Sequence, residues 1–196
     1  MRVTGGRWSS RRLRGPSKGQ KLRPTPDAMR ERAFAVIGDE ITGATVLDLF
    51  AGTGAVGIEA LSRGAERAVF VEAHPSAVKL IVSNLETLEM SRDGGRVINR
   101  TADRAVRELA RMGRVFDLVW ADPPFESWTD GLDALVAAAR GGLCAPGALL
   151  CLECPAEAGV EEALPRTLEI RRDLMGGASR VVMLRLALGT AAAPKG

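Results

Sequence analysis

Histidine and cysteine are scarce in this sequence. Its 196 residues include one histidine, His74, and three cysteines, Cys144, Cys151 and Cys154. An odd number of cysteines in a chain of this size argues against a disulfide framework. Cys151 and Cys154 have the spacing of half a zinc site, but no second pair follows, and His74 is remote in the sequence. We therefore expect structural roles for these residues and predict no metal site.

The sequence also lacks a long apolar run. Arginine and proline interrupt each apolar stretch before it reaches the roughly 18 residues of a membrane span. Met1-Arg2-Val3-Thr4 leads into glycine and arginine rather than into the apolar centre of a secretory signal. With 46% hydrophobic residues, the chain can still bury one sizeable core. We expect a soluble, cytoplasmic, monomeric protein that has no membrane partner.

Acidic residues are absent from the first 23 positions. Eight of the 27 lysines and arginines fall there, which leaves 19 cations against 24 anions in the rest of the chain. Glycines and prolines among them favour an irregular arm or a small hairpin over a helix. Clustered cations bind a phosphate backbone, and Trp8 either stacks on an unpaired base or caps the hairpin. We call residues 1–24 the basic arm; a solvated tail is the alternative. The residues predicted to contact RNA are Arg7, Trp8, Arg11, Arg12, Arg14, Lys18, Lys21 and Arg23.

The body of the chain, residues 25–190, alternates strand and helix patterns. Thr25-Pro26-Asp27 begins a helix that ends at Gly38. Strands are then predicted at 45–49, 67–72, 96–99, 115–120 and 147–152, helices at 55–63, 75–89, 102–111 and 130–140, and a closing hairpin of strands at 166–173 and 179–186. This order predicts an α/β, Rossmann-like fold with a mostly parallel seven-stranded sheet, an antiparallel C-terminal strand and a small N-terminal extension. We expect a flexible tail at 191–196.

The first predicted strand runs into a glycine loop. Gly52, Gly54 and Gly57 fit G-x-G-x-x-G at a strand-to-helix turn, where missing side chains let a ligand approach the backbone. Glu72 ends the second strand and stands 20 residues after Gly52, a position that suits hydrogen bonds to a ribose diol. This pair fits a dinucleotide as well as S-adenosylmethionine (SAM).

Two further carboxylates favour SAM. Asp48 precedes the glycine loop, where it would attract the ammonium and sulfonium of SAM but repel a pyrophosphate. Asp103, in Thr101-Ala102-Asp103 after the third strand, can accept the adenine amino group or cap the next helix. The predicted cofactor-binding residues are Asp48, Phe50, Ala51, Gly52, Thr53, Gly54, Glu72, Ala102 and Asp103.

An acid and two prolines end the strand predicted at 115–120. Prolines cannot donate to a sheet ladder, so the chain must leave the sheet here. Asp122 and the Pro123 carbonyl would then face the ligand crevice and accept both hydrogens of an amino group on a planar base. Holding both hydrogens favours a pyramidal nitrogen whose lone pair faces a methyl donor. We predict catalytic roles for Asp122, Pro123, Pro124 and Phe125, with Phe125 stacking on the base; simple turn chemistry is the alternative.

These motifs resemble those of a known family, the RsmD family of SAM-dependent 16S ribosomal RNA guanine-N2 methyltransferases. The segments that carry the resemblance are Arg2-Val3-Thr4-Gly5-Gly6, Arg23-Pro24-Thr25-Pro26-Asp27 with Arg30-Glu31, Asp48-Leu49-Phe50-Ala51-Gly52-Thr53-Gly54, Leu61-Ser62-Arg63-Gly64-Ala65 and Asp122-Pro123-Pro124-Phe125. The resemblance implies a class I methyltransferase fold, SAM as cofactor, an RNA-binding N-terminal extension, and methylation of one guanine in 16S rRNA or in the small ribosomal subunit.

Two other functions stay open on the residues alone. A methyltransferase of the same fold can act on adenine in DNA or RNA, or on a protein amide. A non-catalytic ribosome-assembly factor would need neither Asp122 nor a ligand on the glycine loop. Binding of SAM, measured by calorimetry, separates this last function from the other two.

Overall fold

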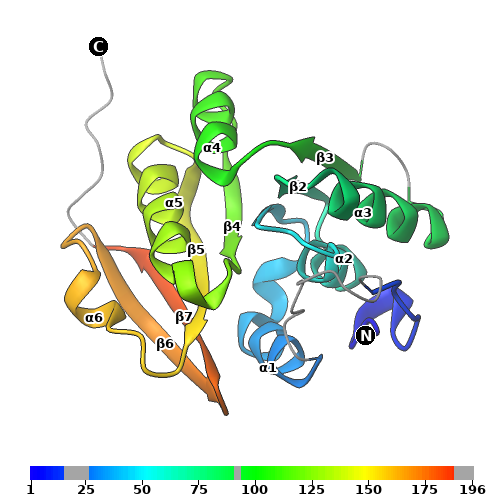
Figure 1. Cartoon of the computed structure of the whole chain (residues 1–196), viewed down its shortest axis with the longest axis horizontal. Helices are drawn as coiled ribbons and strands as arrows, with labels where there is room; N and C mark the ends of the chain where they lie inside the picture. The colour runs from blue at the N-terminus through cyan, green and yellow to red at the C-terminus, as the bar shows by residue number, and fades with distance from the viewer. Residues whose placement is uncertain (16–26, 91–93, 188–196) are drawn as a thin grey trace.

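The centre of the molecule is a seven-stranded sheet. The computed structural model describes residues 1–15, 27–90 and 94–187. The strands are β1 (Thr45–Leu49), β2 (Arg67–Glu72), β3 (Gly95–Asn99), β4 (Phe116–Ala121), β5 (Cys144–Pro155), β6 (Leu168–Gly176) and β7 (Ser179–Leu186). They are arranged in the order β3-β2-β1-β4-β5-β7-β6 (Figure 1). The first five run parallel, whereas β7 runs antiparallel to β5 and β6. This is the predicted sheet.

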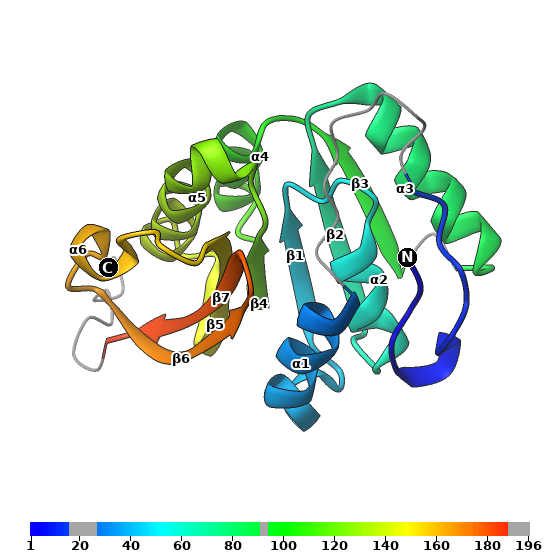
Figure 2. The ribbon, with the colours of Figure 1, turned by 60° about the horizontal axis from the view of Figure 1, so that its bottom comes forward.

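Helices cover both faces of the sheet (Figure 2). One face packs against α1 (Asp27–Ile37), α2 (Ala55–Ser62) and α3 (Pro75–Thr87), and the other against α4 (Ala102–Arg111) and α5 (Trp128–Arg140). Shorter helical turns are η1 (Gly6–Trp8), η2 (Gly38–Ile41), η3 (Phe125–Ser127) and α6 (Val160–Ala163). In the described ranges, no helix is long and apolar enough to cross a bilayer.

Alternating side chains along the strands build two cores. Val46 packs beside α1, α2 and α3, while the next residue, Leu47, packs beside α4 and α5. Trp120 of β4 is fully buried, and its ring stacks on Phe34 of α1 with the centroids 6.0 Å apart. Because both faces are covered, the central strands are mostly apolar, as is typical of parallel sheets.

The sheet changes direction between β1 and β4. From β1 the chain winds outward to β2 and β3, and it then returns to place β4 on the other side of β1. In open α/β sheets, such a reversal leaves a crevice outside the carboxyl ends of the two strands. The glycine loop after β1 and the acceptor loop Asp122-Pro123-Pro124-Phe125 after β4 therefore meet at the same crevice.

Residues 1–15 of the basic arm form an antiparallel turn that is docked on the body. Arg2 and Arg12 form an antiparallel bridge, and Val3 and Arg11 are joined by a backbone hydrogen bond of 3.0 Å. Val3 and Leu13 are buried and extend the core beside α1 and α2. The alternative of a solvated tail is therefore wrong for these residues. Lys18, Lys21 and Arg23, and the tail predicted at 191–196, lie outside the described residues.

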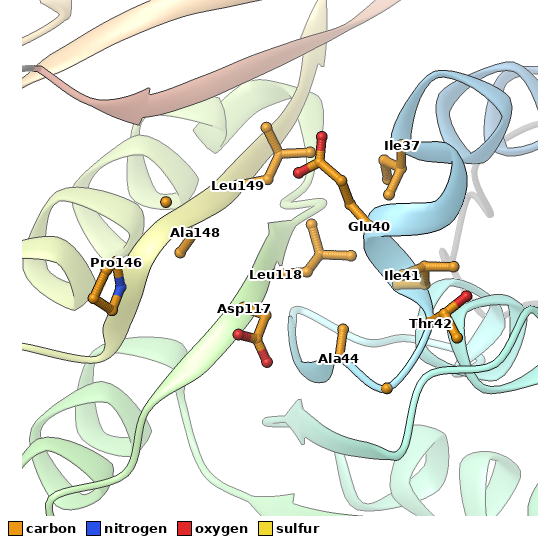
Figure 3. A pocket seen from close by; sticks show the side chains of 12 residues that line it. Ile37, Glu40, Ile41, Thr42, Ala44, Asp117, Leu118, Pro146, Ala148 and Leu149 are labelled. Atoms are coloured by element: carbon orange, nitrogen blue, oxygen red, sulfur yellow. The ribbon is translucent and has the colours of Figure 1, made fainter.

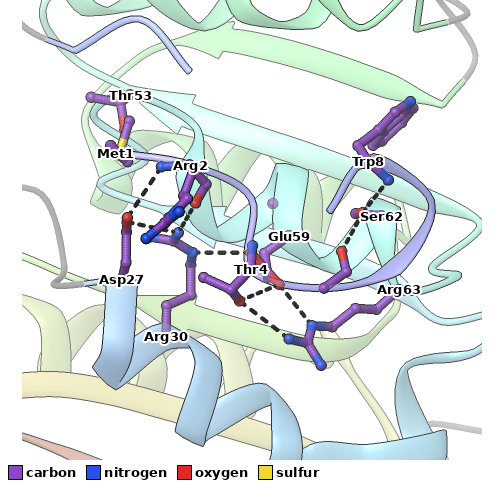
Figure 4. Close-up of polar contacts among 12 residues, drawn as sticks. Met1, Arg2, Thr4, Trp8, Asp27, Arg30, Thr53, Glu59, Ser62 and Arg63 are labelled. Carbon is purple, nitrogen blue, oxygen red and sulfur yellow. Dashed lines mark hydrogen bonds and ion pairs between the residues drawn. The ribbon is translucent and has the colours of Figure 1, made fainter. Parts of the chain in front are cut away.

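A buried ion network fixes the arm to α1 and α2 (Figure 4). The Arg30 side chain is fully buried, and its Nε lies 3.2 Å from the Glu59 carboxylate. Glu59 also accepts hydrogen bonds from Thr4 Oγ1 at 2.6 Å and from Arg63 Nε at 2.7 Å. Burial raises the pKa of Glu59. The hydrogen bonds from Thr4 and Arg63 and the charge of Arg30 outweigh this effect, so the pKa lies below its usual range. Arg30 also pairs with Asp27 at 3.0 Å, so two residues of the N-terminal motif hold the fold together.

Candidate cofactor and substrate site

A cavity of about 1120 Å³ lies at the carboxyl ends of the central strands. It extends from the glycine loop and β2 past the acceptor loop to the turn between β6 and β7. The cavity brings together twelve of the thirteen residues predicted for cofactor binding and catalysis, namely Asp48, Phe50, Ala51, Gly52, Thr53, Glu72, Ala102, Asp103, Asp122, Pro123, Pro124 and Phe125. Gly54, the thirteenth, is the N-cap residue of α2 and is not among the residues that line the cavity.

The glycine loop is tightly wound. Gly52 and Gly54 have φ angles of 55° and 79°, in the left-handed region that favours glycine. Phe50, which is not glycine, has a φ angle of 60°, and such strain is common beside ligand sites. A Cβ atom on Gly57 would lie 2.3 Å from the Phe70 ring, so this glycine lets α2 pack directly on β2. The first two glycines therefore shape the loop, while Gly57 serves packing.

Glu72 secures the glycine loop to β2. Its carboxylate accepts a hydrogen bond from the Gly52 N–H at 2.9 Å and another from the His74 N–H at 2.7 Å. The residue is 6% exposed and lines the cavity. A carboxylate has about four acceptor positions, so it can also accept the hydroxyls of a ribose.

Asp48 is a buried carboxylate behind the loop. It is 1% exposed, and it accepts a hydrogen bond of 2.9 Å from the Gly57 N–H at the start of α2. Burial, helped by the nearby charge of Glu72, raises the pKa of Asp48 to about 7 against the lowering effect of the Gly57 hydrogen bond. A cationic ligand group beside Asp48 would offset the cost of its buried charge.

Asp103 lies in the first turn of α4, where the cavity opens to solvent. Its side chain is 65% exposed and forms an ion pair with Arg107, one turn along the helix. The adenine contact predicted for Asp103 stays a prediction. Arg100, His74 and Ser179 also line the cavity, although none of them was predicted as a site residue.

The acceptor loop leaves the sheet at the expected point. β4 ends at Ala121, and Asp122 is the first residue beyond it. Pro123 is buried against α5, because a Cβ atom on Gly131 would lie only 2.7 Å from the proline ring. The Pro124 carbonyl accepts the Ser127 N–H at 2.9 Å, which closes the short turn η3. Asp122 and the half-buried Phe125 therefore lie on a loop that is fixed from both sides.

A second, smaller hollow of about 330 Å³ lies at the opposite end of the strands, between η2 and the beginnings of β4 and β5 (Figure 3). Its two acidic residues already have partners: Glu40 pairs with Arg185 at 2.5 Å, and Asp117 accepts the Thr45 N–H at 2.8 Å. No predicted site residue lies there. The ligand crevice of this fold is at the carboxyl ends, so the first cavity is the candidate site.

The described part of the basic arm presents its cations to solvent. Arg7, Arg11, Arg12 and Arg14 are all exposed. Arg11 donates to the Thr87 carbonyl at 3.0 Å, and Arg14 to the Ser83 hydroxyl at 2.7 Å, so both lie along α3. Trp8 is half-buried, and the Arg7 guanidinium lies 3.8 Å from the centre of its ring. Arg7 therefore covers part of the surface on which a base would stack.

Asn84 of α3 links the arm to the glycine loop. This residue is 1% exposed; it accepts the Arg14 N–H at 2.8 Å and donates to the Thr53 carbonyl at 2.9 Å. Met1 also reaches the loop, because the Thr53 hydroxyl lies 3.5 Å from its sulfur atom. The sequence analysis missed this connection, although a lone polar residue among the apolar positions of α3 is the signal that marks it.

Comparison with known proteins identifies the family. A family model described as "Conserved hypothetical protein 95" matches residues 1–185. Ribosomal RNA small subunit methyltransferase D of Escherichia coli (strain K12) is 34% identical over 179 residues, which cover 90% of this chain and 85% of that protein. The chain belongs to the RsmD family.

Two further comparisons agree with this assignment. The putative rRNA methyltransferase YlbH of Bacillus subtilis (strain 168) is 40% identical over 126 residues, which cover 64% of this chain and 67% of that protein. The solved structure of the putative methyltransferase yhhF from Escherichia coli has a TM-score of 0.77 at 30% identity, and the match covers 95% of this chain and 97% of that one. The predictions of family, fold class and an rRNA methyltransferase are confirmed.

Proposed function

We propose that this RsmD-family enzyme methylates the exocyclic N2 amino group of a guanine in 16S rRNA, presented as free rRNA or within the small ribosomal subunit. SAM supplies the methyl group as an electrophile on its sulfonium. The single observation that carries the proposal is the position of Asp122 and Pro123 in the same cavity as the glycine loop, Asp48 and Glu72.

The cofactor half of the cavity fits SAM by its chemistry. Asp48 offers a buried carboxylate for the ammonium group, and Glu72 offers acceptors for the ribose hydroxyls. Asp103, which lines the cavity at the start of α4, offers an acceptor for the adenine amino group. Because three carboxylates surround this half, it favours a cationic ligand over a pyrophosphate.

The acceptor half holds the base. Asp122 and the Pro123 carbonyl accept the two amino hydrogens, and Phe125 stacks on the ring. Bound SAM would supply the methyl group to the nitrogen, and the electron pair of the broken carbon–sulfur bond would remain on its sulfur. The nitrogen then loses one proton, for which the Asp122 carboxylate is the adjacent acceptor. Catalysis in this site is therefore mainly positioning and electrostatics.

Mapping of the methyl group tests the proposal. Small subunits and naked 16S rRNA are incubated with tritiated SAM and the purified chain, and the labelled nucleotide is identified after digestion. N2-methylguanine at one position is the expected product. Label on adenine, or on a ribosomal protein, would instead favour the other methyltransferase functions that the residues left open.

The pH dependence of SAM binding tests the role of Asp48. The ionised carboxylate attracts the ammonium, so protonation removes this attraction. With a pKa of about 7, affinity should fall as the pH drops below 7, by up to about tenfold per pH unit. The Asp48→Asn variant should bind weakly at every pH, without this slope. Calorimetry between about pH 5.5 and 8.5 measures the affinity of both proteins. Equal slopes of affinity against pH would show that Asp48 does not bind the ammonium group.

We also propose that the basic arm tracks rRNA phosphates. Deleting the arm is a poor test, because the deletion would remove Val3, Leu13 and Thr4, which is one of the partners of Glu59, from the fold. Replacing the exposed Arg7 and Arg12 by glutamine leaves Val3, Leu13 and Thr4 in place. Each lost phosphate contact should flatten the slope of log affinity against log salt by roughly 0.7–0.9, so the pair should change it by about 1.5.

Filter binding at several salt concentrations measures that slope. Arg104→Gln and Arg111→Gln on the exposed face of α4 provide a matched control with the same loss of charge. SAM affinity should stay unchanged in both proteins. If the two substitutions on α4 flattened the slope and the two substitutions in the arm did not, the RNA-binding surface would lie on α4.

A further inference from the structure

Three neighbouring parallel strands each carry a carboxylate at their carboxyl ends. These are Asp48 on β1, Asp122 just beyond β4 and Glu153 on β5, and all three line the cavity. The residue before each of them packs in the core beside α4 and α5. Because side chains alternate along a strand, the three carboxylates lie on the other face, toward α1 and α2. Asp48 and Asp122 have roles in the proposed reaction, whereas Glu153 has none so far.

Glu153 lies next to Asp122. Ala121 of β4 is paired with Leu152 of β5, so the residues that follow them, Asp122 and Glu153, are at the same level of the sheet. Adjacent strands are about 4.8 Å apart, which is within the span of one nucleobase edge. Glu153 is 2% exposed, and on its other side it is paired with Val181 of β7. Its carboxylate therefore belongs to the inner wall of the acceptor half.

Guanine differs from adenine and cytosine, the other bases with an amino group, at the ring position beside that group. Beside the amino carbon, guanine has a ring N1–H, which is a donor, whereas adenine and cytosine each have a ring nitrogen that carries a lone pair. A carboxylate accepts hydrogen bonds and donates none when ionised. Two carboxylates side by side thus match the three N–H groups of guanine and repel the lone pair of adenine or cytosine.

We propose that Glu153 accepts the N1–H of the target guanine while Asp122 and Pro123 hold its N2 amino group, and that this contact selects guanine. The assignment rests on the proposed function and adds the residue that sets its base specificity. A site built around such a hydrogen bond rejects a base that lacks the donor much more strongly than a shape difference alone would, because the buried acceptor then meets a lone pair.

The test compares two target bases once the modified position has been mapped. Small subunits are reconstituted with guanine or with 2-aminopurine at that position; 2-aminopurine keeps the 2-amino group but has no N1–H. The wild-type chain should prefer guanine by at least about 100-fold in kcat/KM. In Glu153→Gln, turnover of guanine should fall by about 10- to 100-fold, and the preference should collapse, because the amide can donate to the N1 lone pair.

2-Aminopurine lacks the O6 atom as well as the N1–H. This second difference is the same for the wild-type chain and for Glu153→Gln, so the change in preference between the two proteins reports the N1 contact. SAM affinity and melting temperature should be unchanged in Glu153→Gln. Glu157→Gln, an exposed position after β5, should keep the wild-type preference. If Glu153→Gln keeps the wild-type preference for guanine, the proposal is overturned. Equal rates of the wild-type chain on the two bases would also overturn it, and that measurement needs no variant. If the wild-type chain methylates neither base, the proposed function itself has failed.

Discussion

Replacing Asp122 by alanine should lower the rate of methyl transfer by at least about 100-fold while SAM affinity is retained. The variant loses the carboxylate that holds an amino hydrogen, and it leaves the glycine loop, Asp48 and Glu72 in place. Single-turnover kinetics with tritiated SAM measure the rate, and calorimetry measures the affinity. Wild-type turnover in Asp122→Ala would contradict the role proposed for the acceptor loop.

A matched control for Asp122→Ala is Asp39→Ala. Asp39 is an exposed acid in η2, at the amino ends of the strands, and it does not line the catalytic cavity. Its loss changes the net charge by the same amount, so both rate and affinity should match the wild type. A similar loss of rate in the two variants would indicate a general electrostatic effect instead of a local one.

Replacing Glu59 by glutamine should destabilise the fold by about 3 kcal/mol. The substitution keeps the shape of the side chain but leaves the fully buried Arg30 with one of its two ionic partners. For a chain of this length, such a loss lowers the melting temperature by about 6–12 °C. Scanning calorimetry measures it. Glu66→Gln is the control, because the pair of Glu66 with Arg67 is exposed and should contribute less than about 1 kcal/mol.

The sign of the pH effect identifies the cause. Because the folded protein lowers the pKa of Glu59, its contribution to stability is present above the usual pKa of a glutamate and is lost as the pH falls through the lower, folded value. The difference between wild type and Glu59→Gln should therefore shrink below about pH 4. A difference that stayed constant down to pH 3 would show that packing, and not charge, is responsible.

Most of the fold could be predicted because its elements have clear periods. Ala102, Ala105, Val106 and Leu109 recur at helical spacing and form the buried side of α4, with arginines on the outside. The errors fall where no period exists. α6 has four residues, which are too few to show a pattern. β5 begins early, at Cys144, and its pairing with β4 is then interrupted, so the sequence at its beginning resembles that of a loop.

The cofactor loop could be predicted because strand, turn and helix signals coincide there, but three buried polar residues could not. Glu59, Asn84 and Glu153 are 2% exposed or less, and Glu59 and Glu153 each stand between apolar residues in the sequence. Two of them have partners far away in the chain, namely Thr4 for Glu59 and Arg14 for Asn84. Sequence shows that such a residue interrupts an apolar run, but only the packing of elements shows what it meets.

The basic arm is made well before the surface that holds it. Arg14 precedes its partner Asn84 by 70 residues, and Thr4 precedes Glu59 by 55. At about 5–20 residues per second, a translating ribosome needs about 4–14 seconds to add the longer of these stretches. Until α2 and α3 have emerged, the arginines of the arm have no helix on which to dock. The arm is therefore synthesised before the helices that hold it but fixed in place only after them.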